Sequence, residues 1–553
     1  MADNGSEVRD FRRAVAGALE GLWPSAVSAE DSDTAKLVEV AAQQGWYQLG
    51  EAAAADYLVA AVRELGRRSC PLPVADAYVA TILFPEHAAA IGDGELRPVI
   101  IHGSAGADTV VDDAGTATHG VVLDHAADTV SLHPLAAAHS LAGLAAPALR
   151  EVSLGDGVHS RRLHDGEAQR VTALLRLAVA ARATAAAGRA HELAVEHALV
   201  RQQFGKVIGA FGAVQQRVAA CQIEVSASEA LVDEAVEAFL ADRADAQIAA
   251  ALAARHARTA AQRIMAGAQH TLGAVGFFDE HEAAWLFRRV HTDLSHLGSG
   301  ALDDRRGDGV ADRLLEGEGL PNFHLGDRAE AFREEVRALL TRFRRPDPDL
   351  AAGVAGEYDV EALRAEMDRQ SLFALNWPEE YGGKEVSVEE QVVLHEEMKY
   401  AGGPVDRAMS ATMLIGHSLL RHGTAAQKAQ FLPLLHAGQM AFCLGYSEPE
   451  AGSDLASLRT RAVRDGDDWV IDGQKLWTTR GNTASHVWLA VRTNPDAQPR
   501  HAGITIFLVP MDTPGITVQN HTALSGRSPA PSSTTASGCP TPAASERSMA
   551  DGV

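Results

Sequence analysis

Two short segments near residue 460 combine small, hydroxyl and aromatic side chains at a spacing that suits a bound cofactor. Residues 442–454 read FCLGYSEPEAGSD, and residues 469–481 read WVIDGQKLWTTRG. In the first segment, small side chains let the backbone approach a ligand closely, and the Ser453 hydroxyl with nearby N–H groups can donate to a pyrophosphate. In the second, Trp477 offers a flat face and Thr479 a hydroxyl donor, which is what holding the isoalloxazine of a flavin requires. SEPEAGSD alone is typical of an acidic turn, but the two segments together favour a flavin site.

A second group of candidate residues lies in the first half of the chain. Residues 201–206 read RQQFGK, and residues 211–215 read FGAVQ. The planar guanidinium of Arg201 suits a phosphate, and the ring of Phe204 can pack against an adenine or a flavin edge. The structural alternative is a helix that ends at a glycine beside a solvated arginine. The residues alone leave both interpretations open.

These segments resemble motifs of the acyl-CoA dehydrogenase family, whose middle β domain carries a TEPxAGSD-like segment and then a GxKxWITN-like segment. Here they read SEPEAGSD and GQKLWTTR, with Arg480 in the position of the family's Asn. The resemblance implies FAD as the cofactor and an acyl-CoA as the substrate. It implies contacts by five residues: Tyr446 and Ser447 along the flavin ring, Ser453 at the FAD pyrophosphate or the substrate, and Trp477 and Thr479 flanking the flavin.

The same resemblance assigns a role to the RQQFG segment, because an RxxFG segment in the family's C-terminal helical domain reaches the FAD of a neighbouring subunit. It implies that Arg201, Gln203 and Phe204 contact the cofactor. The stretch QHTLGAVGF resembles the QxxGGxG turn of that domain, which adds Gln269 and Gly273 to the flavin-binding residues. The family resemblance therefore also implies a homo- or hetero-oligomer of acyl-CoA dehydrogenase subunits and an electron-transfer flavoprotein as the electron acceptor.

The catalytic base remains unassigned. The family reaction removes the α-proton of an acyl-CoA with a carboxylate base while the β-hydrogen leaves as hydride to flavin N5. In many members the base is a Glu near the end of the C-terminal domain, and the matching stretch HTDLSHLGSG places Leu297 at that position. Asp293 and His296 are titratable, but a lone His at a helix end is more often a capping or solvated residue. Glu282 matches no family base position. We expect weak or absent dehydrogenation by this chain alone.

The elements that must position these residues follow a repeated order. Residues 7–90 show apolar side chains at three-to-four spacing, such as Phe11, Val15 and Leu19, which predicts helices. Runs rich in β-branched residues predict strands at 99–101, 109–111, 121–123, 469–471, 487–491 and 504–509. The order is helix, β, helix, linker, helix, β, which is typical of a long internal repeat whose second copy stops early.

This organisation predicts seven segments. They are an N-terminal helical domain (1–96), a reduced β domain (97–165) and a C-terminal helical domain (166–300) in the first copy; a linker (301–326); an N-terminal helical domain (327–440) and a β middle domain (441–525) in the second copy; and a disordered tail (526–553). The tail is rich in Ser, Thr, Pro and Ala without periodicity, and we expect a frameshift or truncation near Ser525.

Composition excludes several classes of function. The 553 residues carry a formal charge of 49 − 73 = −24, which opposes binding to nucleic acid or to an anionic membrane surface. The four cysteines form no CxxC pair, so neither a structural zinc site nor a disulfide framework is indicated. No run of about 18 uninterrupted apolar residues and no signal peptide occurs, and we expect a cytoplasmic protein.

The predicted fold is mainly α with β middle domains, resembling an acyl-CoA dehydrogenase: α bundle, β barrel-like domain and α bundle, repeated with the second copy truncated. The two copies are complementary, because the first lacks a SEPEAGSD counterpart and the second lacks a C-terminal helical domain. The resemblance implies an FAD-dependent dehydrogenase of a CoA thioester, in fatty acid or steroid degradation. The alternatives are a non-catalytic partner subunit of a heteromeric acyl-CoA dehydrogenase and a flavin oxidase of the same fold.

Overall fold

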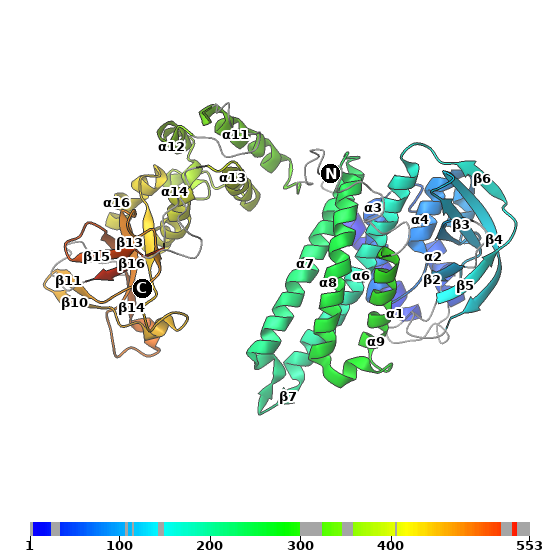
Figure 1. Ribbon diagram of the computed structural model, residues 1–553, viewed down its shortest axis with the longest axis horizontal. Helices are drawn as coiled ribbons and strands as arrows, with labels where there is room; N and C mark the ends of the chain where they lie inside the picture. Colours follow the sequence, from blue (N-terminus) through cyan, green and yellow to red (C-terminus); the bar gives the residue numbers. More distant parts are fainter. Residues whose placement is uncertain are drawn as a thin grey trace. The chain divides into compact units, whose positions relative to one another are not determined.

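The computed structural model divides the chain into two compact units, unit 1 (Met1–Phe323) and unit 2 (His324–Val553), which are described separately (Figure 1). The structure describes residues 4–23, 34–52, 54–104, 109–112, 115–141, 149–298, 323–345, 358–403, 406–520 and 533–538. Most of the linker predicted at 301–326 therefore lies outside the described residues.

Unit 1 begins with helices whose apolar stripes face one core. Val15 and Leu19 have no exposed surface, and Phe11 packs against the same core, as their helical spacing predicts. A tryptophan and a tyrosine, Trp46 and Tyr47, fill the space between the helices. The elements are α1 (Asn4–Leu22), α2 (Thr34–Gln43), α3 (Ala55–Arg67), α4 (Val74–Leu83), the short 3-10 turn η2 (Pro85–His87) and α5 (Ala88–Gly92).

A six-stranded sheet follows, in the order β1-β3-β4-β5-β2, with β6 paired to β4. The three predicted runs become β1, β2 and β3, and three further strands complete the sheet. The strands are β1 (Pro98–His102), β2 (Thr109–Asp112), β3 (His119–Asp124), β4 (Thr129–Ser140), β5 (Leu149–Leu154) and β6 (His159–Arg162). β4 can pair with three neighbours because it is long and its register shifts between Leu135 and Ala137.

Four long helices close unit 1: α6 (Glu167–Val200), α7 (Gly212–Leu240), α8 (Ala246–Leu272) and α9 (Glu282–Leu297) (Figure 1). Buried alanines, including Ala187 on α6 and Ala261 on α8, line the contacts between these helices. A side chain at Gly267 on α8 would collide with the Cys221 sulfur on α7, so these helices approach closely. α6 is long and apolar enough to cross a membrane, but 94% of its apolar window is buried inside the protein.

The helical part of unit 2 contains Trp377, which is fully buried in one cluster with Ile415, Leu419 and Leu435. The turn after Trp377 is tight, because a Cβ at Gly383 would collide with the Trp377 carbonyl. The π-helix at Thr412–Gly416 brings Gly416 against the indole in the same way. The elements are α11 (Asp327–Phe343), α12 (Val360–Arg369), η7 (Leu372–Ala374), η8 (Glu379–Tyr381), α13 (Val388–Tyr400), α14 (Asp406–Ala411), η9 (Thr412–Gly416), α15 (His417–His422) and α16 (Ala425–His436).

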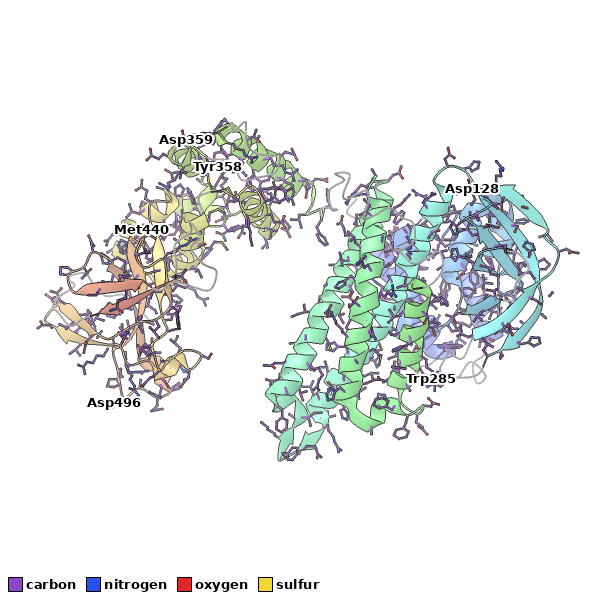
Figure 2. The ribbon with its side chains drawn as sticks, in the orientation of Figure 1. Asp128, Trp285, Tyr358, Asp359, Met440 and Asp496 are labelled. Carbon is purple, nitrogen blue, oxygen red and sulfur yellow. The ribbon has the colours of Figure 1, made fainter. Side chains whose placement is uncertain are left out.

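The β part of unit 2 contains two sheets. One has the order β11-β10-β13-β14 with β9 paired to β13, and the other has the order β12-β16-β15. Met440 lies just before β9 and is buried among helix and strand residues, at the junction of the two parts of this unit (Figure 2). The strands are β9 (Phe442–Gly445), β10 (Arg461–Asp465), β11 (Asp468–Asp472), β12 (Thr478–Thr479), β13 (His486–Arg492), β14 (Ile504–Pro510), β15 (Ile516–Asn520) and β16 (Ser533–Gly538).

The strand β16 corrects the predicted tail. Residues 526–553 are predicted to be disordered, but Ser533–Gly538 pairs antiparallel with both β15 and β12. Ser, Thr and Ala can form this strand because the hydrogen bonds between strands come from the backbone. The strand is short and polar, so no hydrophobic pattern in the sequence predicts it. The rest of the predicted tail lies outside the described residues.

Candidate functional site

The two motif segments of unit 2 are joined by a buried ion pair. Glu448 lies in SEPEAGSD, directly after β9, and Lys475 lies in GQKLWTTR, after β11. Lys475 Nζ is 2.8 Å from Glu448 Oε1, and both side chains are at least nine-tenths buried. The backbone N–H groups of Arg459 and Thr460 donate to the two carboxylate oxygens at 2.6 and 2.9 Å. Glu448 therefore has charge-assisted bonds on both oxygens.

Backbone contacts fix the two loops further. Lys475 Nζ donates to the Tyr446 carbonyl at 3.0 Å, and the Leu476 N–H donates to the Ser447 carbonyl at 2.7 Å. The loop from Glu448 to Ala451 closes on itself through two backbone hydrogen bonds of 2.8 and 3.2 Å. We call Glu448, Lys475 and these contacts the clamp. The clamp holds the loops that carry all five residues implicated in unit 2 at one place.

Burial and pairing act in opposite directions on the clamp's charges. Burial alone would raise the pKa of Glu448, but Lys475 and the N–H donors outweigh it and lower that pKa. Burial also lowers the pKa of Lys475, and the Glu448 carboxylate opposes that shift. Glu448 is therefore an ionised carboxylate near neutral pH. Its oxygens are occupied, so it holds the loops in position and is not available as a base.

The side chains above the clamp are exposed. Trp477 has 64% of its surface exposed and adopts a φ of 60°, whereas the next residue, Thr478, is fully buried. Ser453 and Thr479 are also exposed, and a Cβ at Gly452 would meet open space. A positive φ is an unfavourable backbone conformation for tryptophan, and it persists only where the surrounding structure imposes it. An exposed indole is also a typical feature of a binding surface. These residues fit a cofactor that brings a planar ring and a pyrophosphate.

Tyr446 and Ser447 are less exposed to solvent than Ser453, Trp477 and Thr479. Both are half-buried, and the Tyr446 ring packs against the cluster that contains Ala451 and Leu458. A cavity of about 90 Å³ in the same unit has a lining that includes Phe442, Leu444, Leu414 and Arg480. Arg480, which replaces the family's Asn, thus lines a cavity between the helices and the sheet of this unit.

The RQQFG segment of unit 1 forms an exposed hairpin at one end of the helical bundle. Strands β7 (Gln202–Gln203) and β8 (Lys206–Val207) flank a turn in which Phe204 has a φ of 53° and 92% exposure. The Phe204 ring meets Phe211 edge-on at 6.2 Å, and Lys206 Nζ lies 4.2 Å from the centre of the Phe211 ring. Arg201 and Gln203 are exposed on the same hairpin.

Gln269 and Gly273 lie at that same end. α6 leads into the hairpin, α7 returns from it, and α8 runs back, so the C-terminal ends of α6 and α8 meet at one end of the bundle (Figure 1). Gln269 is buried, and Gly273 adopts a φ of 68° that suits glycine. Phe277 and Phe278 are exposed in the adjacent turn. The five implicated residues of unit 1 therefore share one end of the bundle, which we call the bundle end.

The titratable residues of α9 do not supply an accessible carboxylate. Leu297 packs between α6 and α8 with 3% exposure. Asp293 has no exposed surface and accepts from Arg182 at 2.7 Å and from Arg289 at 2.8 Å. Glu282 pairs with Arg189 at 3.1 Å. Asp293 is thus a buried ion-pair partner of two arginines.

Asp293 belongs to a group of four buried charges that sequence inspection missed. Asp112 at the end of β2 pairs with Arg289 and lies 3.5 Å from Arg182. Burial alone would raise the pKa of Asp112, but the two arginines lower it. We call Asp112, Arg182, Arg289 and Asp293 the charge cluster. It ties β2, α6 and α9 together, and residues so far apart in sequence give no local signal of their pairing.

A cavity of about 260 Å³ lies against this cluster in unit 1. Its polar lining comes from Asp76, His102, Thr109, Asp112, Arg182 and His296, and the rest is apolar. Burial raises the pKa of Asp76 to about 6, although the Ile100 N–H donates to it at 2.8 Å. Burial and the neighbouring His125 lower the pKa of His102 to about 4. Burial likewise lowers the pKa of His296.

Comparison with known proteins shows the family of this chain. Sequence models of three domains match the chain: the acyl-CoA dehydrogenase C-terminal domain at residues 167–301, the N-terminal domain at 326–439 and the middle domain at 443–536. Acyl-CoA dehydrogenase FadE34 of Mycobacterium tuberculosis is 34% identical over 503 residues, which is 85% of this chain and 66% of FadE34. The chain belongs to the acyl-CoA dehydrogenase family. The order C-terminal, N-terminal, middle is that of one family unit followed by the first two domains of another.

Other family members match shorter parts. Acyl-CoA dehydrogenase FadE26 of Mycobacterium tuberculosis is 42% identical over 193 residues, covering 34% of this chain and 48% of FadE26. The crystal structure of the ChsE4-ChsE5 complex from Mycobacterium tuberculosis is 36% identical, with a TM-score of 0.34, over 39% of this chain and 55% of that one. This acyl-CoA dehydrogenase chain thus spans about half to two thirds of the length of these relatives.

Proposed function

We propose that this protein is an FAD-dependent oxidoreductase that dehydrogenates the acyl group of a CoA thioester between its α and β carbons. The observation that carries the proposal is the clamp. Buried ionic and backbone bonds hold the SEPEAGSD and WTT loops together, while Ser453, Trp477 and Thr479 stay exposed above them. Preorganised loops of this kind bind a ligand at a low cost in conformational entropy.

Each of the exposed residues Ser453, Trp477 and Thr479 would make a different contact with the cofactor. Bound FAD would accept the hydride that leaves the β carbon. The Trp477 indole would stack against the planar ring, the Thr479 hydroxyl would donate to a ring heteroatom, and the Ser453 hydroxyl would donate to the pyrophosphate or the substrate. Tyr446 and Ser447 would border the same ring. The open space at Gly452 leaves the backbone accessible to a bulky anion.

The bundle end of unit 1 would complete the cofactor site of another subunit. Its Arg201 guanidinium suits a phosphate, and the Phe204 ring is 92% exposed and accessible to a ligand. Gln203, Gln269 and Gly273 would contact the same cofactor. We therefore propose an assembly with further acyl-CoA dehydrogenase subunits, either identical or unlike, and an electron-transfer flavoprotein as the electron acceptor.

A second candidate function is a non-catalytic partner subunit. Three observations support it: Leu297 is packed in the core, Asp293 is held by two arginines, and Glu282 by one. With these positions occupied, the described residues of α9 offer no free carboxylate to remove the α-proton. In that case the chain would bind and orient, and a second subunit would supply the base.

The first test is the visible absorption spectrum of the purified full chain, with the ratio of flavin to protein after gel filtration. Near-stoichiometric FAD is expected. Trp477→Ala should weaken FAD binding about two- to twelvefold, because aromatic stacking contributes about 0.5–1.5 kcal/mol. Val463→Ala, exposed on β10 of the same domain, is the matched control and should bind FAD normally. Absence of FAD from a folded full chain would contradict the proposal.

Activity then separates the candidates. Addition of an acyl-CoA under anaerobic conditions should bleach the flavin if the chain holds its own base. Bleaching only after a second acyl-CoA dehydrogenase subunit is added would favour the partner function. Rapid reoxidation of the reduced flavin by O₂, without an electron-transfer flavoprotein, would identify a flavin oxidase instead.

A further inference from the structure

Away from the bundle end, three side chains of unit 1 that are of metal-binding types lie close together at the edge of its sheet. Glu86 and His87 lie in the η2 turn between α4 and α5, and His159 is the first residue of β6. One ligand atom of each side chain lies within 4.8 Å of the other two. The cluster is formed only by folding, because about seventy residues separate the turn from the strand.

The geometry is close to that of a metal site. His159 Nδ1 is 3.0 Å from Glu86 Oε1, and the centres of the His87 and His159 rings are 5.8 Å apart at an angle of 75°. Tetrahedral Zn²⁺ binds imidazole nitrogen and carboxylate oxygen at about 2.0–2.2 Å, which places its ligand atoms about 3.4 Å apart. The pair formed by Glu86 and His159 is near this spacing, and a ligand atom of His87 lies within 4.8 Å of both.

The two imidazoles are held in place by an aromatic neighbour. The Phe84 ring lies 6.2 Å from the His87 ring and 5.2 Å from the His159 ring. Phe84 is 1% exposed and is part of the main core of unit 1. A fixed neighbour limits the orientations of both rings, so less entropy is lost when they bind an ion.

His87 provides an independent observation. Its Nε2 atom is buried and has no hydrogen-bond partner among the described residues. A buried polar atom without a partner costs about 1–3 kcal/mol, so native structures pair it with protein, water or an ion. A simple surface ion pair between Glu86 and His159 would leave this cost in place, whereas a metal-binding cluster gives His87 a function.

The nearby positive charge is already neutralised. The Arg161 guanidinium lies 5.9 Å from the centre of the Phe84 ring, but it donates to both Glu167 oxygens and to the Leu83 carbonyl at 3.0 Å. Its charge is therefore compensated by Glu167, and repulsion of a divalent cation at the cluster is reduced.

We propose that His87, His159 and Glu86 bind a divalent transition-metal ion, best matched by Zn²⁺, with water completing the coordination. Two imidazoles and a carboxylate are the ligand types that Zn²⁺ accepts when it keeps an open position. Bound there, the ion joins the turn after α4 to the first residue of β6. It would therefore couple the N-terminal helices of unit 1 to its sheet.

The test uses the full chain, stripped of metal by a chelator and titrated with ZnCl₂, with Co²⁺ as a coloured substitute. One high-affinity equivalent of Zn²⁺ and a Co²⁺ absorption typical of four-coordination are expected. His87→Ala and His159→Ala should each weaken this binding at least about 100-fold, because loss of even an outer-shell partner costs 10–100-fold. His139→Ala, an exposed histidine on β4 of the same sheet, is the control and should bind as the parent protein does.

Glu86→Gln guards against variants that fail to fold, because the Glu86 side chain is 45% exposed. It should keep the melting temperature of the metal-free chain, lose at least about tenfold in Zn²⁺ affinity and lose the thermal stabilisation by Zn²⁺. The proposal is overturned if Zn²⁺ binds with equal stoichiometry and affinity to the parent chain and to all three cluster variants.

Discussion

The clamp of unit 2 and the charge cluster of unit 1 are both buried ionic groups, but they stand in different relations to the exposed candidate residues. The clamp lies in the same two loops as Ser453 and Trp477. The charge cluster includes Arg182 on α6, and Arg201 follows it by 19 residues, about 28 Å along a helix. Unit 2 therefore uses buried charge to shape a binding loop, whereas unit 1 uses it to fasten helices to a sheet.

This difference shows what a buried ion pair can be retained for. Such pairs contribute little net stability compared with apolar packing, but removing one partner is costly because the other charge stays buried. In unit 2, any movement that separates Glu448 from Lys475 would leave a buried charge unpaired, so the ion pair keeps the two loops in position. In unit 1 the same cost protects the packing of α9, the helix on which the family's base would otherwise be sought.

The largest effect is expected from Asp293→Asn. This change leaves Arg182 and Arg289 buried with one carboxylate fewer, so the free energy of unfolding of unit 1 should fall by about 3–5 kcal/mol. Hydrogen exchange of α9 peptides measures the loss. Asp242→Asn removes the exposed pair with Arg170 and should cost less than about 1 kcal/mol. Equal effects of the two changes would mean that the buried charge cluster is no more important for stability than an exposed ion pair.

Lys475→Met should destabilise unit 2 by about 2–4 kcal/mol, because Glu448 keeps its charge without its cation. Exchange should rise in both motif loops together, since the clamp joins them. Asp472→Asn, in the exposed pair with Arg461, is the matched control and should change little. If only one loop loosened, the two loops would not share a single support.

Opposite pH dependence should follow from the two kinds of carboxyl. The pKa of Asp76 is raised to about 6, so its contribution to stability is present below about pH 4 and is lost as the pH rises through 6. The pKa of Glu448 is lowered, so its contribution is present above about pH 4 and is lost as the pH falls through the folded value.

Asp76→Asn tests the first half of that contrast. It should raise the free energy of unfolding of unit 1 by about 1–3 kcal/mol at pH 7 and by almost nothing at pH 4. Urea unfolding at both values measures it, with Asp93→Asn, which is exposed, as the control. A gain of equal size at pH 4 would mean that the effect is not one of proton binding.

The smallest effects on stability are expected at the exposed aromatic residues. Phe204→Ala and Trp477→Ala remove large side chains that are 92% and 64% exposed, so each should change the free energy of unfolding by less than about 0.5 kcal/mol. Thermal unfolding measures this, and Trp377→Ala, a fully buried tryptophan, provides the contrast at about 3–5 kcal/mol. A large cost at Phe204 or Trp477 would indicate a packing role instead of a binding role.

Local patterns predicted much of the fold. The three-to-four spacing of Val15 and Leu19 predicted α1, and runs such as residues 487–491 predicted strands, because burial of one face imposes these periods. β16 was missed because short polar strands have no such period. β4 joins three partners through a register shift, and neither the partners nor the shift is visible in its own residues.

For the candidate site, the motifs located the loops but not what holds them. Glu448 and Lys475 both lie within the quoted segments, and opposite charges in two adjacent motifs are a signal that could have paired them. Asp112 and Arg289 lie 177 residues apart, and no local spacing could bring them together. The burial of the Leu297 side chain could not be predicted from the sequence either, because it depends on how α9 packs against α6 and α8.

The alanines between α6 and α8 have a consequence for how unit 1 tolerates sequence change. Each buried alanine removes little apolar area from water, so these helices gain much of their cohesion from close approach and dispersion. Side chains that are larger would force the helix axes apart, and overpacking typically costs about 1–3 kcal/mol. Along this interface, selection should therefore act on volume more than on chemistry: serine or glycine should be accepted at positions where leucine or valine is rejected.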